Sequence, residues 1–218
     1  MVKMAISKDS PKDPLKIKRI MKNALLIFAQ EGYRDTKTDK IAQAAEVSKG
    51  TLFRYYQNKA NLYLATLRYA MDRVDKAADY SVWTGADDLV EMIIRATKYK
   101  IELQLAYPTE FKLLLHAYGA PSSLPAQLRA ETQQIYAQNT QKTFETLITP
   151  VLQKMPLRKD IPLPLIRKAI TALVDLVQQE AQDFIRKHPD AAISDLEEII
   201  MHAQSYMNIL QDGFSAPE

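Results

Sequence analysis

Apolar residues recur every three or four positions along most of the chain, which is the spacing of one face of an α-helix. In residues 14–31 this spacing covers several turns, and Gly32 follows as the predicted helix stop. Similar stripes predict helices over residues 59–78, from residue 87 or 88 to the interruption at Tyr107, and over residues 108–118, 125–153, 162–187 and 194–211. A loop is expected at Trp83–Gly85, and Pro150 is expected to kink or fray its helix.

Residues 36–59 differ from the rest because their periodic segments are short. Thr36 followed by Asp39 resembles a capping box, which predicts a helix beginning near Lys37. After a three-residue turn, Ser48 is the predicted N-cap of the next helix. That helix is expected to point Leu52, Phe53 and Tyr56 inward and to turn outward Lys49, Gly50, Thr51, Arg54 and Tyr55.

The outward set of residues has the chemistry of a DNA-binding helix. Gly50 lets a phosphate approach the backbone, Thr51 offers a hydroxyl and a methyl group, and Arg54 offers a planar fork of donors. A short helix with such a face fits the major groove of duplex DNA. The sequence therefore predicts a helix-turn-helix whose second helix reads DNA.

Composition and charge agree with this prediction. The chain has 5 Gly, and its 11 Pro fall mostly between the periodic segments, which favours an all-α fold of long helices. Its formal net charge of +3 is unevenly distributed, because residues 1–60 hold 13 Lys and Arg against 6 Asp and Glu, whereas the remainder holds 16 against 20. A basic head on a mildly acidic body is expected if only the head meets a polyanion, although solvating lysines alone would give the same balance.

Several other classes of protein find little support. The chain has no Cys, which excludes disulfides and thiolate metal sites and fits a reducing compartment, and we expect the protein to be cytoplasmic with no membrane span. His116, His188 and His202 lie far apart, so no metal site and no cofactor are predicted. No nucleophile elbow, phosphate-cradling glycine loop or cluster of histidines with acids is present, so we do not expect an enzyme.

The run from Gly32 to Leu62 resembles the N-terminal domain of the TetR family of transcriptional regulators. The matching residues are Gly32-Tyr33, Thr36, Ile41-Ala42, Val47-Ser48, Gly50-Thr51-Leu52-Phe53, Tyr56, Lys59 and Leu62. Two positions depart from the family pattern: Glu46 stands where the turn usually has glycine, and Tyr55 replaces a frequent histidine. If the turn requires a left-handed backbone, Glu46 costs roughly 1 to 2 kcal/mol.

The resemblance implies two domains, a DNA-binding domain over residues 1–57, with 1–13 as a flexible leader, and a larger effector-binding and dimerisation domain over residues 58–218. Lys59 at the start of the fourth helix is expected to clamp a phosphate, a role that both its charge and the helix dipole favour. The residues that we expect to contact DNA are Lys37, Thr38, Ser48, Lys49, Gly50, Thr51, Arg54, Tyr55 and Lys59.

The last two predicted helices carry broad apolar stripes, wider than one neighbouring helix can cover. Leu165, Ala172 and Leu176 widen the first stripe, and Tyr206 and Ile209 lie beside the second. The resemblance implies that these helices form a four-helix bundle in a two-fold dimer, and a monomeric core is the alternative. The predicted interface consists of Ile166, Ile170, Leu173, Val177, Phe184, Leu196, Ile200, Ala203 and Met207.

The family usually binds a ligand among the middle helices of the body. Candidate residues combine apolar walls with polar tips, which suits an aromatic or amphipathic molecule, although the same residues would also serve as plain core. They are Tyr99, Leu103, Phe111, His116, Tyr118, Tyr136 and Phe144.

The sequence thus predicts a homodimeric DNA-binding regulator, a repressor that leaves a near-palindromic operator when a small hydrophobic or aromatic effector binds. Two alternatives remain open at this point: a DNA-bound protein of the same type whose body binds a protein partner, and a helical enzyme with a basic surface.

Overall fold

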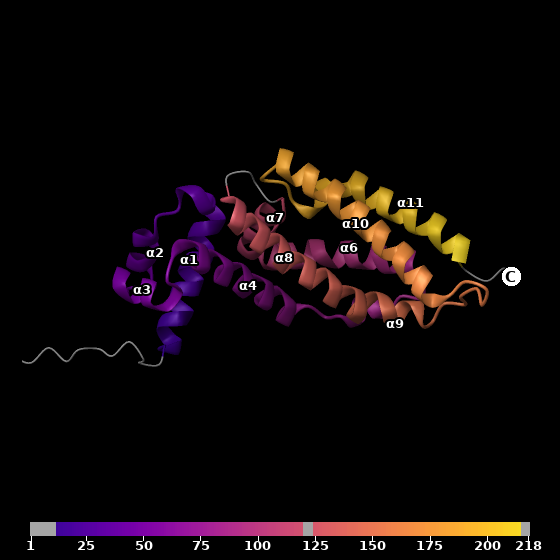
Figure 1. The fold of residues 1–218 in the computed structure, drawn as a ribbon, viewed down its shortest axis with the longest axis horizontal. Coiled ribbons are helices and arrows are strands. Elements are labelled where there is room, and N and C mark those ends of the chain that lie inside the picture. Colours follow the sequence, from indigo (N-terminus) through magenta and orange to yellow (C-terminus); the bar gives the residue numbers. More distant parts are fainter. Residues whose placement is uncertain (1–11, 120–123, 215–218) are drawn as a thin grey trace, which may run out of the picture.

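The computed structural model describes residues 12–119 and 124–214, and within these residues its regular elements are all helices, without strands. The all-α prediction is therefore confirmed. Figure 1 shows a small head at one end of a long body. The head consists of α1 (Pro14–Asp35), α2 (Thr38–Ala44) and α3 (Lys49–Tyr56). The body consists of α4 (Lys59–Ala77), α5 (Ser81–Thr84), α6 (Leu89–Ala106), α7 (Pro108–Tyr118), α8 (Ala126–Thr143), η1 (Phe144–Ile148), α9 (Thr149–Leu152), α10 (Leu163–Lys187), η2 (Ile193–Leu196) and α11 (Glu197–Phe214).

Local side-chain caps explain where several helices begin. The Asp13 carboxylate accepts hydrogen bonds from the backbone N–H groups of Leu15 and Lys16 and starts α1. Asn58 and Asp88 start α4 and α6 in the same way. Pro108 occupies the first position of α7, as predicted, where its missing N–H costs no helical hydrogen bond.

The start of α2 differs from the prediction. The capping box is wrong, because the Thr36 hydroxyl donates to the carbonyl of Gly32, at 2.6 Å, and Lys37 is the N-cap without a side-chain bond. Gly32 does interrupt α1, with φ of 70°, but the helix continues beyond this kink to Asp35. Thr36 thus closes the preceding helix instead of opening the next one.

Two predictions in the body need correction. The expected loop around Trp83 contains the short helix α5, and Trp83 itself is buried. The expected single helix over residues 125–153 is divided, because a π-helical turn, η1, separates α8 from α9. This break precedes Pro150, which lies in the first turn of α9 and therefore does not kink a longer helix there.

Two apolar cores run through the molecule. The first includes α1, α2 and α3 and continues into α4, α7 and α8, where Leu67, Leu113 and Leu128 are buried with Phe28 of the head. The second fills the rest of the body, with Leu89, Ile166 and Met207 among its buried members. An ion pair between an exposed arginine and a buried carboxylate also connects α4 to α7: Arg73 Nε lies 2.6 Å from Glu110 Oε1. The head is therefore packed on the body through α4 and α7.

The leader expected over residues 1–13 lies outside the described residues except for Lys12 and Asp13. Residues 120–123, between the helices predicted over 108–118 and 125–153, also lie outside them. The boundary at residue 57 stays a prediction, and the apolar core of the head extends across it. A search of the described helices finds none that is both long and apolar enough to cross a membrane.

Candidate nucleic-acid interface

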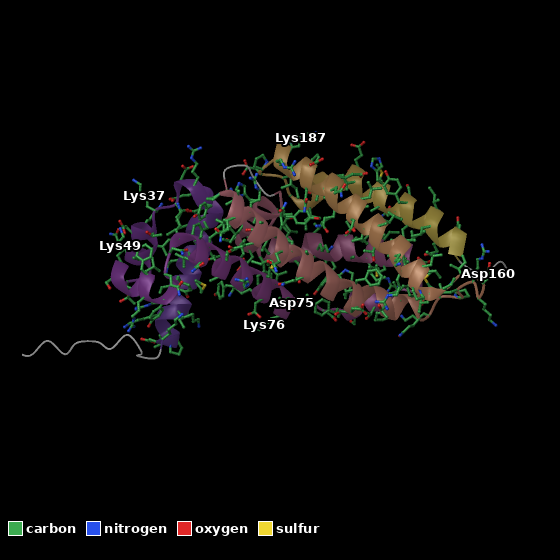
Figure 2. All side chains as sticks on the ribbon, in the orientation of Figure 1. Lys37, Lys49, Asp75, Lys76, Asp160 and Lys187 are labelled. Atoms are coloured by element: carbon green, nitrogen blue, oxygen red, sulfur yellow. The ribbon has the colours of Figure 1, made fainter. Side chains whose placement is uncertain are left out.

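The helix α3 lies at the outer end of the head, away from the body. Ser48 starts it as predicted: its Oγ accepts a hydrogen bond from the Thr51 N–H at 3.1 Å. Figure 2 shows Lys37 and Lys49 projecting from this end, on the side opposite to α10 and α11. The helix α3 contacts the body through α4, and its outward residues, including Lys49, Gly50 and Arg54, are exposed and available to a large partner.

Most of the predicted DNA-contacting residues form one accessible surface, which we call the α3 surface. Lys37, Ser48, Lys49, Gly50 and Arg54 are exposed, and Thr38 and Thr51 are half-buried. A Cβ added at Gly50 would meet only Ser48 Oγ, at 3.9 Å, so packing within the protein does not require glycine there. An absent side chain instead allows a phosphate backbone to approach closely.

The charges on the α3 surface are solvated and loosely held. Lys49 Nζ lies 2.8 Å from a carboxylate oxygen of Asp39, which joins α2 to α3. Both side chains are exposed, so this pair contributes at most about 1 kcal/mol to stability and yields readily to a phosphate. The Arg54 guanidinium lies 5.1 Å from the centre of the Tyr55 ring and has no ion-pair partner among the described residues.

The predicted orientation of Tyr55 is wrong. Its side chain is only 4% exposed, and its hydroxyl accepts a hydrogen bond from the Asp13 N–H at 2.9 Å. Lys12 Nζ also donates to the Tyr55 carbonyl at 2.7 Å, so the start of α1 covers this part of α3. Tyr55 therefore supports the α3 surface from beneath instead of extending it.

Phe53 is the residue that sequence reasoning placed on the wrong side. It was expected to point inward, but it is half-exposed and lies outside the apolar core of the head, whereas Tyr56 packs against that core. An accessible aromatic ring between Thr51 and Arg54 adds an apolar contact to the α3 surface. The one indication of this orientation in the sequence was that Phe53 directly follows Leu52, which is buried.

Lys59 begins α4, as predicted, and lies against the end of α1. Its Nζ donates to the Arg34 carbonyl at 3.0 Å and lies 4.7 Å from the centre of the Tyr33 ring. Burial lowers the pKa of Lys59, and the nearby Asp35 opposes this shift. These contacts fix the ammonium beside the helix N-terminus, where an anion is also favoured by the helix dipole.

Glu46 does adopt the left-handed backbone that the turn of the helix-turn-helix requires, with φ of 52°. Its carboxylate accepts from Arg19 Nη1 of α1 at 2.9 Å. The turn is thus retained despite the missing glycine. The contact with α1 offsets part of the cost of that conformation.

The structure divides the residues of the predicted dimer interface into a buried group and a partly accessible group. Ile166, Ile170 and Met207 are buried in the core of their own chain, so they are not available to a partner. The other six predicted residues are partly accessible: Leu173, Val177, Phe184, Leu196, Ile200 and Ala203. Other apolar side chains of α10 and α11 are more exposed, among them Leu165, Leu176, Met201 and Ile209. The apolar stripes of the sequence have Leu165, Leu176 and Ile209 at their margins, and the predicted interface does not include them.

The predicted effector-binding residues fall into two separate groups. Tyr99, Leu103, Phe111 and Phe144 belong to the core of the body, and the Tyr99 hydroxyl accepts from the Asp79 N–H at 2.8 Å. The other three residues lie at the junction with the head. Tyr136 packs against the first core and stacks edge-on with Tyr118 at 5.2 Å, and a Cβ added at Gly32 would lie 3.8 Å from a ring carbon of His116.

Burial determines the protonation of the three residues at the junction with the head. Desolvation lowers the pKa of His116, which favours its neutral form, and raises the pKa values of Tyr118 and Tyr136. No group of three or more histidines and acids among the described residues is arranged to hold a metal ion.

Comparisons with known proteins agree with this geometry. Residues 20–66, which span the head and the start of α4, match the model of the family described as "Bacterial regulatory proteins, tetR family". The uncharacterized HTH-type transcriptional regulator YuxN of Bacillus subtilis is 40% identical over 58 residues, which cover 27% of this chain and 20% of that protein. The biofilm operon icaADBC negative transcriptional regulator IcaR of Staphylococcus aureus is 25% identical over 154 residues, which cover 64% of this chain and 82% of that protein.

The aligned segments span only a fifth to a third of the length of the first curated relatives, so these similarities concern the head. Solved structures extend the likeness of the fold to the body. A tetR-family transcriptional regulator from Streptomyces coelicolor superposes with a TM-score of 0.57 at 16% identity, over 90% of this chain and 82% of that one. A transcriptional regulator from Rhodococcus sp. Rha1 gives a TM-score of 0.59 at 17% identity, over 92% and 98% of the two chains. With its helix-turn-helix head and its helical body, the chain belongs to the TetR family.

Proposed function

We propose that the protein is a sequence-specific DNA-binding transcriptional regulator, a homodimeric repressor that leaves a near-palindromic operator when a small effector binds its body. The observation that carries this proposal is the α3 surface. On α3 itself this surface presents two exposed cations, Lys49 and Arg54, with the Thr51 hydroxyl, Gly50 and the half-buried ring of Phe53, at the outer end of the head. These groups supply phosphate contacts and base-edge contacts from one short helix.

The exposed apolar side chains of α10 and α11 support the dimer. Leu165, Leu176, Met201 and Ile209 are 58%, 43%, 53% and 72% exposed, and Figure 1 shows the two helices side by side along one edge of the body. Leu165 and Leu176 lie eleven residues apart, which is three turns of one helix face. A two-fold partner placed on this edge would cover the same side chains of both chains.

A dimer gives the head its specificity. Two α3 helices about 34 Å apart enter successive major grooves on one side of a duplex, so the operator has two inverted half-sites. An effector that changes the angle between α4 and the other helices of the body changes that separation. It thereby weakens DNA binding without touching the α3 surface.

The proposal is tested by selecting duplexes from a random pool with the full-length protein and measuring their affinities by fluorescence anisotropy. We expect enrichment of inverted half-sites whose centres lie about 10 base pairs, or a multiple of this, apart. Enrichment of no sequence, or of an unpaired motif only, contradicts the proposal.

A pair of lysine variants tests the surface itself. Lys49→Gln should weaken binding to every duplex and lower the slope of log affinity against log salt by about 1 per protomer. Lys187→Gln is the matched control, because Figure 2 places this lysine on the body, far from α3. Equal effects of the two substitutions would show that binding depends on overall charge and not on α3.

A further inference from the structure

Lys100 of α6 lies on the side of the helix that packs against the rest of the body. That side contains Leu89, Met92 and Leu103, all buried, and Lys100 follows Ala96 by four residues and precedes Leu103 by three. At 3.6 residues per turn this spacing places Lys100 within the apolar stripe. The opposite side of α6 is the solvent side, which carries Ile94, Lys98, Glu102 and Leu105.

Contacts on both flanks of Lys100 confirm the direction of this stripe. On one flank, the Tyr99 ring packs edge-on against Trp83 of α5 at 5.2 Å. On the other flank, the Gln104 side-chain oxygen accepts from the Ile193 N–H of η2 at 2.8 Å. Lys100 therefore points between two elements that are packed against α6.

Lys100 nevertheless has a large accessible surface. It is exposed, and its neighbours on the same side, Ile93 and Ala96, are partly accessible. A lysine on the solvent side would show such exposure as a matter of course. On the inner side, the same exposure implies that the neighbouring helices leave a space beside Lys100.

The ammonium of Lys100 has no ion-pair or hydrogen-bond partner among the residues that the structure describes. Some other lysines of the body are paired, for example Lys154, whose Nζ donates to the carbonyls of Thr84 and Ala86, and Lys112, which lies 3.5 Å from Asp190. Surrounding protein desolvates Lys100 and lowers its pKa, even though the side chain has accessible surface. The exposure and the desolvation of Lys100 are compatible if its accessible surface faces an enclosed space and not bulk water.

An unpaired, desolvated cation destabilises a fold unless a bound ligand supplies the missing counter-charge. The complementary ligand group is an anion, and the apolar residues on either side of Lys100 call for an apolar remainder. We propose that Lys100 anchors the carboxylate of an apolar organic acid that binds against the inner side of α6. This inference rests on the proposed effector-controlled function, and it changes the expected effector from a hydrophobic or aromatic molecule in general to an anion.

Trp83 provides a built-in reporter, because it is the single tryptophan of the chain and contacts the residue next to Lys100. The full-length protein is titrated with decanoate and 4-phenylbutyrate, and with the matched neutral alcohols decan-1-ol and 4-phenylbutan-1-ol, by fluorescence and calorimetry. At least one acid should bind more tightly than its alcohol. Lys100→Met should weaken that acid at least about 30-fold and leave the alcohol unchanged.

Lys98→Met is the matched control, since this lysine lies on the solvent side of the same helix. It should leave the affinity for both acids unchanged. Equal affinity of the acid for wild type and Lys100→Met overturns the inference, and so does the absence of acid binding to the wild type.

Thermal unfolding without ligand gives a second test that needs no choice of ligand. Lys100→Met should raise the Tm by about 2–4 °C, because it removes an uncompensated charge and keeps an apolar stem of similar size. An unchanged or lowered Tm, with Lys98→Met as the reference, contradicts the absence of a partner for Lys100.

DNA affinity measured in the same samples separates the two proposals. If an acid binds through Lys100 and DNA affinity does not change, the Lys100 site stands and effector control fails. If the alcohol releases DNA at the same concentrations as the acid does, effector control stands and the Lys100 site is overturned.

Discussion

The outer face of α3 and the inner face of α6 both carry an accessible lysine, but the two lysines lie in different surroundings. Lys49 of α3 is exposed to solvent and paired with Asp39, among other polar residues. Lys100 of α6 lies in an apolar stripe, desolvated and without a partner in the described chain. A solvated charge costs little, so a surface can collect several of them for a long polyanion, whereas a desolvated charge requires one specific counter-ion.

The different surroundings of the two lysines predict that binding at the head and binding in the body respond differently to salt and to the loss of a charge. Binding at the head should respond gradually to salt and to the loss of single charges. Binding of an apolar acid in the body should fall at least about 30-fold when Lys100 is lost. Three substitutions test the structural supports of the head and the edge formed by α10 and α11, beginning with the largest expected effect.

Tyr55→Ala tests whether the head's surface depends on a buried support. Removing this ring should lower the free energy of unfolding by about 3–5 kcal/mol, because it leaves a cavity between α3 and the start of α1. Urea denaturation followed by circular dichroism measures the loss. Phe53→Ala is the control, since it should reduce DNA affinity with little change in stability; the reverse pattern would return Tyr55 to the DNA-contacting set.

Leu176→Arg tests the exposed edge of the body. A guanidinium placed in the proposed interface, without a partner, should weaken the dimer at least about 100-fold, as measured by analytical ultracentrifugation. Leu105→Arg is the matched control, because Leu105 is 78% exposed on α6, outside the edge formed by α10 and α11. A dimer that survives Leu176→Arg and dissociates with Leu105→Arg would place the interface elsewhere.

Glu46→Gly tests the backbone of the turn in the head. Glycine removes the cost of the left-handed conformation but also removes the exposed ion pair with Arg19, so the net gain in stability should be about 1 kcal/mol. Glu46→Gln, which loses the ion pair and keeps the strain, should be slightly less stable than the wild type. A loss of stability in Glu46→Gly would mean that the contact with α1 outweighs the strain.

Helices and several of their caps could be predicted from the sequence because they depend on nearby residues. Ser48, Asn58 and Asp88 bond to the backbone within three residues, so their type and position were sufficient. Thr36 has the same chemistry, yet a nearby carbonyl, that of Gly32, competes for its hydroxyl. The N-cap rule therefore predicts a cap correctly only where no carbonyl of the preceding helix accepts a hydrogen bond from the capping hydroxyl.

The orientation of neighbouring aromatic residues could not be predicted in this way. Tyr55 and Tyr56 follow each other, and which ring is buried depends on Asp13, which lies 42 residues away along the chain. The π-helical turn at η1 was missed because its apolar pattern differs little from that of an α-helix. Lys100 could be placed on the inner side of α6 from its spacing alone, but its exposure and its lack of a partner required the surrounding helices.

The central claim is that the outer face of α3 reads the operator, and the affinity ratio between a selected operator and a scrambled duplex tests it most directly. Arg54→Ala should lower binding to the operator by about 1–3 kcal/mol and reduce this ratio, while the dimer and the Tm stay unchanged. Arg68→Ala, which removes an exposed arginine from α4, should leave the ratio as it is in the wild type. An unchanged ratio in Arg54→Ala would contradict the claim.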